Sequence, residues 1–441
     1  MILDIPVIRN FRVTEVETDR SPDELYAPFA KQSYSALLTG KGGTDNSRYS
    51  FIGINPLYVH RSSKEPFDEI NHLIDHYSVK DYDYPLSLWG GIGLLSYDAL
   101  HTIESIPHTT RDMYDFPLLT FVFYKDFIVV DHQKQKTYLI QAQTDTTEYT
   151  RSALILEAKI PSYTASVSGN TTMIDKKSYV KRVGRIIDYI KKGDVYEVNL
   201  SHQCATPFSG DAYALFQSLY TRNPAPFSAY LSFGDSAVLS NSPERFLYAR
   251  HNYVETRPIK GTAPRFADPK QDAQSKKALL SSEKDAAELA MIVDLLRNDL
   301  GKISTIGSVC VKEHRRVEAY RKVWHMLSII TSQLRDTVSY GDLLRACFPG
   351  GSITGCPKIR SMEIIDELED YSRHAYTGSI FIANDKRLDS NIIIRTLIAA
   401  DNMLYFNVGG AIVYDSVPEK EYQETLDKAA NIMAVLNDAR H

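Results

Sequence analysis

The order in which strands and helices are expected along the chain most constrains its fold. In the first half, short runs rich in aromatic and β-branched residues are divided by Gly, Pro and Asp, as in LSLWGGIGLLSY (86–97) and LLTFVFYKDFIVV (118–130). The second half adds expected strands at 237–241 and 391–400 to long amphipathic helices at 281–300, 358–370 and 419–438. Because strands and helices do not alternate regularly, we expect an α+β fold and no doubly wound parallel sheet.

One segment marks a change in character along the chain. PSYTASVSGNTT (161–172) is small, polar and rich in turn-forming residues. We therefore predict an N-terminal region over 1–165 and a second domain over 172–433.

Composition excludes several classes of function. The 441 residues are 43% hydrophobic and 24% charged with a net charge of -5, and no basic block indicates nucleic-acid binding. The start, MILDIPVIRNF, lacks the pattern of a signal peptide, and no apolar run of about 18 residues predicts a membrane span. Four scattered cysteines have neither disulfide-framework nor metal-ligand spacing. We expect a cytoplasmic protein with small-molecule ligands.

Two glycine-rich stretches could bind an anion. TGKGGTDNS (39–47) lacks the spacing of a phosphate-binding P-loop, so we predict a turn there. FPGGSITGCPK (348–358) leads into Pro357 at an expected first helical position, where free backbone N–H groups suit an anion. The alternative is a plain loop that enters a helix.

Carboxylates extend the apolar stripes of two expected helices. Asp285 and Glu288 lie in line with Leu289, and Glu421, Glu424 and Lys428 lie in line with Ile432. These side chains should face protein, and acids from two helices together with water are ligands that Mg²⁺ prefers. Acids at helix N-termini and an i,i+4 pair of Glu424 with Lys428 remain the simpler alternative.

Three basic residues stand in unusual surroundings. Lys260, in RPIKGT (257–262), is flanked by Pro258 and Gly261 and could lie in a tight, partly apolar turn or in solvent. Arg395 interrupts the apolar run NIIIRTLIAA and could bind a carboxylate or face solvent. His325, in KVWHMLSII, could be a core histidine or could titrate near a reacting group.

Seven motifs together resemble the chorismate-utilising enzymes, in the order seen in that family. They are SPERFL (242–247), RPIKGT (257–262), ELAMIVDLLRNDLG (288–301), FPGGSITGCPKIRSMEII (348–365), YTGSI (376–380), IIIRT (392–396) and GGAIVYDS with EKEYQETLDKA (409–429). Weaker similarity at 37–56 and 89–98 extends the resemblance to the large subunits of anthranilate and aminodeoxychorismate synthases. A lysine at position 260 is typical of aminodeoxychorismate synthases, where the other members usually carry a small residue.

The resemblance implies a sandwich of two large antiparallel sheets with helices outside, and a function for each matched position. Lys260 would attack the ring of chorismate after partial burial and a nearby Mg²⁺ lower its pKa, Glu244 would protonate the leaving hydroxyl, and His325 would lie near the reacting ring. Glu288 and Glu424 would bind Mg²⁺ directly, with Asp285 and Glu421 close by through water. The remaining matched residues would bind substrate: Gly261, Thr262, Tyr376, Arg395, Gly409, Gly410 and Lys428.

The sequence also departs from the family pattern. Glu197 stands where amine-using relatives generally have Gln and isochorismate-forming relatives have a catalytic Lys, which argues against an isochorismate synthase. Thr39 replaces an acid with which anthranilate synthases bind tryptophan, and Ala411 replaces a glycine, so tryptophan inhibition is not expected.

No glutaminase segment is recognised, so the resemblance implies a separate glutamine amidotransferase subunit as the source of ammonia. A separate lyase would release 4-aminobenzoate for folate synthesis. The alternatives are component I of an anthranilate synthase and a non-catalytic, chorismate-binding partner of a glutaminase.

Overall fold

The computed structural model describes residues 5–40, 47–79 and 83–440. Its centre is a pair of long antiparallel strands, β3 (Tyr49–Ser62) and β5 (Leu119–Asp131), which pair along their whole length. β6 (Lys136–Thr144) and then β1 (Ile8–Val16) extend one part of β5. Most of the predicted turn at TGKGGTDNS, residues 41–46, lies outside the described residues.

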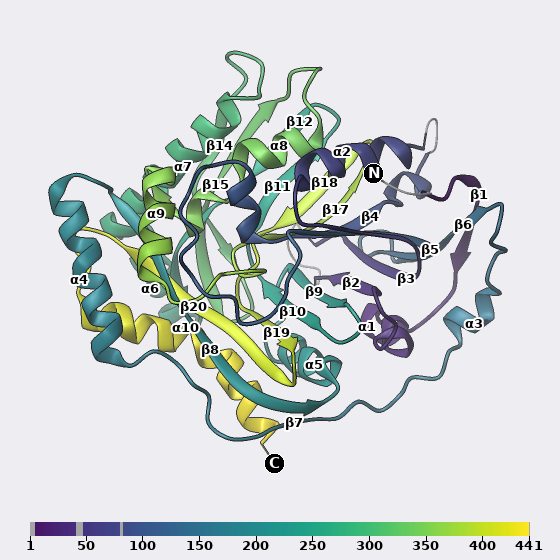
Figure 1. Cartoon of the computed structure of the whole chain (residues 1–441), viewed down its shortest axis with the longest axis horizontal. Helices are drawn as coiled ribbons and strands as arrows, with labels where there is room; N and C mark the ends of the chain where they lie inside the picture. The colour runs from purple at the N-terminus through teal and green to yellow at the C-terminus, as the bar shows by residue number, and fades with distance from the viewer. Residues whose placement is uncertain (1–4, 41–46, 80–82, 441) are drawn as a thin grey trace.

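Two arms of antiparallel strands leave this central pair (Figure 1). The first arm starts beside β3 and runs in the order β2 (Ala36–Thr39), β9 (Phe227–Ser232), β10 (Ala237–Ser242), β19 (Thr396–Ala400), β20 (Met403–Ile412) and β8 (Glu197–Gly210), with β7 (Ala165–Val167) and β16 (Gly355–Cys356) on β8. The second arm starts beside β5 and runs in the order β4 (Gly91–Leu95), β17 (Ser379–Asn384), β18 (Arg387–Asn391), β11 (Arg245–Arg250), β12 (Tyr253–Thr256) and β15 (Val323–Gln333), which also pairs with β13 (Ile259–Pro264) and β14 (Cys310–Ala319). The predicted α+β architecture of two large antiparallel sheets is confirmed.

Helices cover the outside of the strands. They are α1 (Pro22–Tyr26), α2 (Pro66–His76), α3 (Ser152–Leu156), α4 (Lys176–Lys192), α5 (Ala212–Arg222), α6 (Pro269–Leu280), α7 (Glu283–Gly301), α8 (Tyr340–Cys347), α9 (Lys358–Leu368) and α10 (Pro418–Asp438), with short 3-10 turns at 27–29, 86–88, 97–102 and 351–353. Helix α7 packs on β13 and β15, α9 on β8, and α10 on β20 and α4. None of the helices in the described ranges is long and apolar enough to cross a bilayer.

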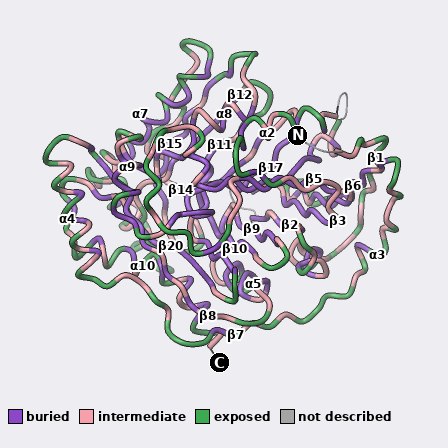
Figure 2. Tube along the Cα trace, in the orientation of Figure 1, coloured by how far each residue is buried: buried purple, intermediate pink, exposed green. Residues whose placement is uncertain are grey.

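The apolar stripe predicted for α7 is the face that enters the core. Leu289, Ile292 and Leu300 are completely buried there, because a repeat of three to four residues puts them on one side of the helix. Figure 2 shows the same division through the molecule, with buried positions along the strands and exposed ones on loops and outer helix faces. The ladders β2–β9 and β4–β17 join segments on either side of residues 161–172.

Two local predictions were wrong. Residues 391–400 are not one strand, because β18 ends at Asn391 and β19 starts at Thr396. Between them Arg395 has a φ of 53°, which a strand cannot accommodate, and Ile393 donates to the carbonyl of Gly378. Pro357 is the residue before α9 and not its first helical residue, although the helix itself begins where it was expected.

Candidate active site

Lys260 lies in a β-bulge of β13. The ladder with β15 is regular at Ile259 and again at Thr262, but its register shifts between them. Gly261 takes a φ of 85°, and a Cβ at this position would lie 3.0 Å from the Cβ of Asp285. A bulge redirects the side chain beside it, and the Lys260 Nζ donates a hydrogen bond of 2.7 Å to Glu197 Oε1 on β8.

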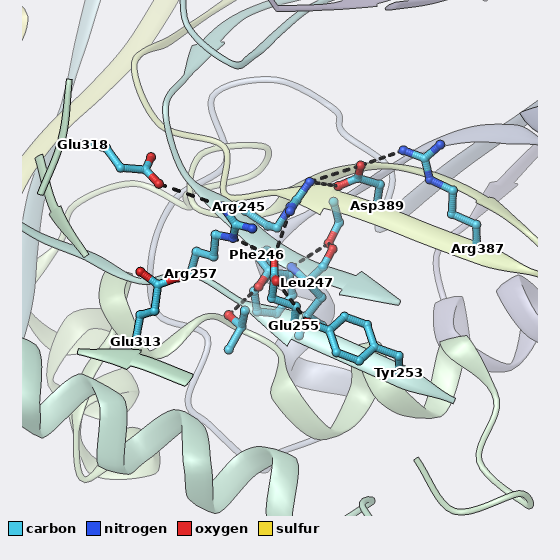
Figure 3. Close-up of polar contacts among 12 residues, drawn as sticks. Arg245, Phe246, Leu247, Tyr253, Glu255, Arg257, Glu313, Glu318, Arg387 and Asp389 are labelled. Atoms are coloured by element: carbon cyan, nitrogen blue, oxygen red, sulfur yellow. Dashed lines mark hydrogen bonds and ion pairs between the residues drawn. The ribbon is translucent and has the colours of Figure 1, made fainter. Parts of the chain in front are cut away.

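A buried network of arginines and acids holds the chain that leads to Lys260 (Figure 3). Arg257 donates through Nε to Glu255 Oε1 at 2.6 Å, and Arg245 donates to the same oxygen at 3.0 Å. The Arg257 Nη1 also lies 3.9 Å from Glu318 Oε1. Because these partners come from β11, β12 and β14, the backbone three residues before Lys260 is fixed from several sides.

The charge state of Lys260 differs from the prediction. Its side chain is 10% exposed and that of Glu197 is completely buried. Burial alone would lower the pKa of Lys260, but the charges of Glu197, Glu288 and Glu244 together raise it above the usual value. In the protein without substrate or metal, Lys260 is therefore an ammonium group, and the effect of burial is not enough to lower its pKa as was expected.

Glu244 is a buried acid between β10 and β11. Ser352 Oγ donates a hydrogen bond of 2.7 Å to Glu244 Oε1. Burial raises the pKa of Glu244 to about 7, although the bond from Ser352 and the charges of Lys260 and Arg395 act in the opposite direction. Near neutral pH this carboxyl group can hold a proton and give it up, as a general acid must.

Arg395 is a cation without a partner. Its guanidinium has no hydrogen bond or ion pair with any residue in the described ranges. Burial lowers its pKa, and Tyr320 and Glu244 are the neighbours whose charge opposes this. A guanidinium in this state suits a carboxylate ligand, which it can bind with two parallel hydrogen bonds.

His325 is a neutral residue beside Lys260 on the neighbouring strand. It shares a hydrogen bond of 2.9 Å between Nδ1 and Thr262 Oγ1. Burial, assisted by the charge of Arg395, lowers its pKa to about 3, and its Nε2 is buried without a partner in the described part of the chain. At neutral pH, His325 can therefore donate or accept a hydrogen bond but does not carry a positive charge.

A second group of expected substrate ligands lies on β20, on α10 and in the loop before β17. Lys428 Nζ donates a 2.9 Å hydrogen bond to the carbonyl of Gly409, and a Cβ on Gly410 would lie 3.2 Å from Glu424 Oε1. Tyr376 is buried, and burial raises its pKa to about 12. Gly410 therefore lies next to Glu424 and Lys428 of α10, whereas a Cβ on Gly409 would lie 2.4 Å from the carbonyl oxygen of Leu200 on β8.

The acids of α7 and α10 differ in their exposure to solvent. The Glu288 side chain is 13% exposed and Glu421 is 5% exposed, and burial raises the pKa of both, with neighbouring acids adding to the effect. In contrast, Glu424 and Lys428 have side chains that are 47% and 44% exposed and form an i,i+4 pair at 2.8 Å. The expectation that these two face protein was wrong, because they form the partly exposed i,i+4 pair that was the simpler alternative.

Magnesium binding by these carboxylates stays a prediction, and they would supply only part of the coordination shell. Within residues 5–40, 47–79 and 83–440, no three His, Cys, Asp or Glu side chains are grouped closely enough to hold a metal ion alone. The raised pKa values of Glu288 and Glu421 show that no nearby cation fully compensates their negative charge. Mg²⁺ typically takes one or two protein carboxylates and completes its octahedron with water and substrate oxygens.

Comparison with known proteins identifies the family. The family model for chorismate binding enzymes matches residues 36–434. The chain belongs to this family. It is 41% identical over 361 residues to aminodeoxychorismate synthase component 1 of Salmonella typhimurium, covering 81% of this chain and 79% of that protein. It is 38% identical over 397 residues to an anthranilate synthase component 1 of Haloarcula marismortui, covering 84% and 78% of the two chains.

Among solved structures, the chain resembles that of anthranilate synthase component I from Streptococcus pneumoniae. The TM-score is 0.77 at 28% sequence identity, and the match covers 94% of this chain and 99% of the other. The fold described above is therefore that of a chorismate binding enzyme.

Two residues of the site in this chorismate binding enzyme were not predicted. Ser352 lies within the glycine-rich stretch 348–358, which was noted for its backbone, and its hydroxyl contacts Glu244. Tyr320 packs edge-on against His325 with ring centroids 4.8 Å apart. Neither belongs to a periodic pattern, so only the fold reveals them.

A separate cavity of about 380 Å³ lies between the two arms, away from Lys260. Thr39 lines it together with Arg245, Arg257 and Arg387. The Thr39 hydroxyl is buried and hydrogen-bonded to Ser50 at 2.9 Å. The absence of tryptophan inhibition, inferred from Thr39, stays a prediction.

Proposed function

We propose that this chain is the chorismate-converting component of an aminodeoxychorismate synthase, which forms 4-amino-4-deoxychorismate from chorismate and ammonia. The similarity to a synthase component of this kind at 41% identity supports the proposal. The observation on which it depends is the placement of Lys260 in a bulge that directs its amine into a buried site beside Glu244.

Substrate binding is assigned to the cations and backbone groups around this pair. Chorismate has two carboxylates, and the guanidinium of the unpaired Arg395 would bind the enolpyruvyl carboxylate through two parallel hydrogen bonds. Tyr376 and the N–H groups near Gly409 and Gly410 border the same pocket in our proposal, with Lys428 beside them and with Thr262 and Gly261 forming the wall next to Lys260. Binding the dianion at these fixed groups orients ring carbon 2 toward the Lys260 amine.

The chemistry proceeds through the lysine. The neutral Lys260 amine attacks ring carbon 2, the double bonds of the ring shift, and the bond from carbon 4 to its hydroxyl breaks. Glu244 gives its proton to that oxygen, so that water leaves. Ammonia then attacks carbon 4, the double bonds shift back, and the bond to Lys260 breaks. His325, which is neutral, can hydrogen-bond to the reacting ring without adding charge.

A magnesium ion is part of the proposal. Glu288 and Glu424 would hold it, with Asp285 and Glu421 contributing through water. When bound, Mg²⁺ supplies positive charge that neutralises the ring carboxylate of the substrate and relieves the repulsion among these acids.

Ammonia is proposed to come from a separate glutamine amidotransferase subunit, with free ammonium salt as a substitute in vitro. Release of 4-aminobenzoate for folate synthesis is assigned to a separate lyase. The similarity to an anthranilate synthase component 1 at 38% identity favours that activity as the second candidate. A chorismate-binding protein without activity would have no use for an attacking amine.

Identification of the product tests the proposal. The purified chain is incubated with chorismate, MgCl₂ and ammonium chloride, with and without aminodeoxychorismate lyase, and the products are separated and weighed by mass spectrometry. We expect 4-aminobenzoate only when the lyase is present, and loss of product in Lys260→Ala but not in Lys277→Ala, an exposed lysine on α6. Formation of anthranilate would instead support the second candidate.

A further inference from the structure

The ion pair of Lys260 and Glu197 connects the two arms of the fold. Lys260 comes from β13 and Glu197 is the first residue of β8, and their side-chain atoms approach to 2.7 Å. Within the described ranges, Glu197 is the carboxylate that forms an ion pair with this lysine. The partner of the amine is therefore set by the packing of one arm against the other.

The position of Glu197 is fixed by its backbone. Glu197 pairs with Cys356 of β16, and its carbonyl accepts a hydrogen bond of 3.0 Å from Ser361 Oγ on α9. The adjoining Gly355 approaches so closely that a Cβ there would lie 2.1 Å from that carbonyl oxygen. The backbone of Glu197 is therefore held against β16 and the start of α9, and from this position its side chain reaches the Lys260 amine.

The second oxygen of Glu197 has no partner. Oε2 is buried and lacks a hydrogen bond to any described residue, while the whole side chain has no solvent exposure. A buried carboxylate with one oxygen unpaired costs free energy, because neither water nor a donor compensates for its lost solvation. Transfer of a proton from the ammonium would convert two buried charges into two neutral groups.

Other charged groups surround Lys260 from each neighbouring element. Glu244 faces it from the connection between β10 and β11 and Glu288 from α7, and the charge of Glu424 on α10 also reaches it. Ser352 donates to Glu244, which the mechanism uses as the acid. Glu197 differs from these acids because it makes the hydrogen bond to the amine.

We propose that Glu197 is the positioning residue of Lys260 and accepts its proton when the amine attacks. The proposal rests on the function given above, in which Lys260 reacts as a neutral amine. A proton moves from Nζ to Oε1, so an N–H bond breaks and an O–H bond forms, and the freed electron pair attacks carbon 2. After ammonia has expelled Lys260 as a neutral amine, Glu197 returns the proton to Nζ. The newly attached ammonium group of the product gives its extra proton to Glu244.

Two variants are compared with the wild type. Glu197→Gln keeps the shape of the side chain but cannot accept the proton, and Glu197→Asp keeps the carboxylate. The steady-state kcat and KM for chorismate are measured with ammonium chloride from pH 6 to 10. Labelling of Lys260 by trinitrobenzenesulfonate is measured over the same range by peptide mass spectrometry, with the exposed Lys277 as an internal reference. Circular dichroism and urea unfolding establish that each variant is folded.

Amine-using relatives generally have Gln at this position, but in this chain the carboxylate of Glu197 holds the Lys260 amine. We therefore expect kcat of Glu197→Gln at pH 7 to fall about a hundredfold, as for loss of a general base, with a much smaller change in KM. Its rate relative to that of the wild type should rise with pH, because a Lys260 that is already neutral does not need the base, and Glu197→Asp should recover at least part of the rate. The pH at half-maximal labelling of Lys260 should fall by about one unit or more in Glu197→Gln, because the ammonium loses its counterion.

An unchanged or higher kcat in Glu197→Gln at pH 7 overturns the proton-accepting role, and an unchanged labelling midpoint overturns the control of the lysine charge. Absence of aminodeoxychorismate from the wild type is a failure of the proposed function instead. The labelling experiment remains decisive in that case, because it needs no turnover.

Discussion

Replacement of Glu244 by glutamine gives a direct test of the buried acid. Its pKa is raised from 4.5 to about 7 by burial, so the folded protein binds more protons at this group than the unfolded chain does between these pH values. The stability contributed by the protonated group is fully present below pH 4.5 and is lost as the pH rises through about 7. Glutamine is neutral throughout and avoids this loss.

The expected magnitude follows from the difference in pKa. Between pH 5.0 and 8.5, ionisation should destabilise the wild type relative to Glu244→Gln by about 2.5 kcal/mol. Urea unfolding of both proteins at the two pH values measures this change as a difference of differences, so that all other titrating groups cancel. Glu17→Gln, at an exposed position, controls for the removal of a charge.

The same group should limit activity at high pH. We expect kcat/KM of the wild type to fall as the pH rises above about 7, because the acid that protonates the leaving hydroxyl is lost. Glu244→Gln should lose most of its activity at every pH. A stability difference that stays constant from pH 5.0 to 8.5 would refute the view that Glu244 is a protonated buried acid.

Three further predictions concern the surroundings of the site. Arg395→Gln should raise KM for chorismate by about 10- to 100-fold, because an ionic hydrogen bond contributes about 1.5–3 kcal/mol, and an unchanged KM would exclude it from substrate binding. Gly261→Ala should lower the free energy of unfolding in urea by about 1–2 kcal/mol, since its φ of 85° is left-handed; equal stability would contradict the bulge geometry. Glu424→Gln should raise the Mg²⁺ concentration for half-maximal activity about tenfold, whereas the exposed Glu419→Gln should leave it unchanged, and equal effects would argue against the proposed metal ligand.

The sequence determined the elements whose signals are local. The apolar spacing of 281–300 and 419–438 predicted α7 and α10 to within a few residues, because a helix repeats its contacts within one turn. Composition and the absence of regular alternation were enough for the α+β class. The positive φ of Gly261 is a conformation that glycine permits, so the residue type next to Lys260 is consistent with the bulge.

Contacts between distant segments needed the tertiary structure. Lys260 and Glu197 are 63 positions apart and meet because the two arms pack together, and the resulting charge on the lysine is opposite to what burial alone predicts. Residues 391–400 have the composition of a strand, so nothing in this run indicated the break at Arg395, and the spacing of α10 did not show that Glu424 is exposed. Local patterns report which face of an element is apolar, whereas the charge and partners of a buried group depend on every element that surrounds it.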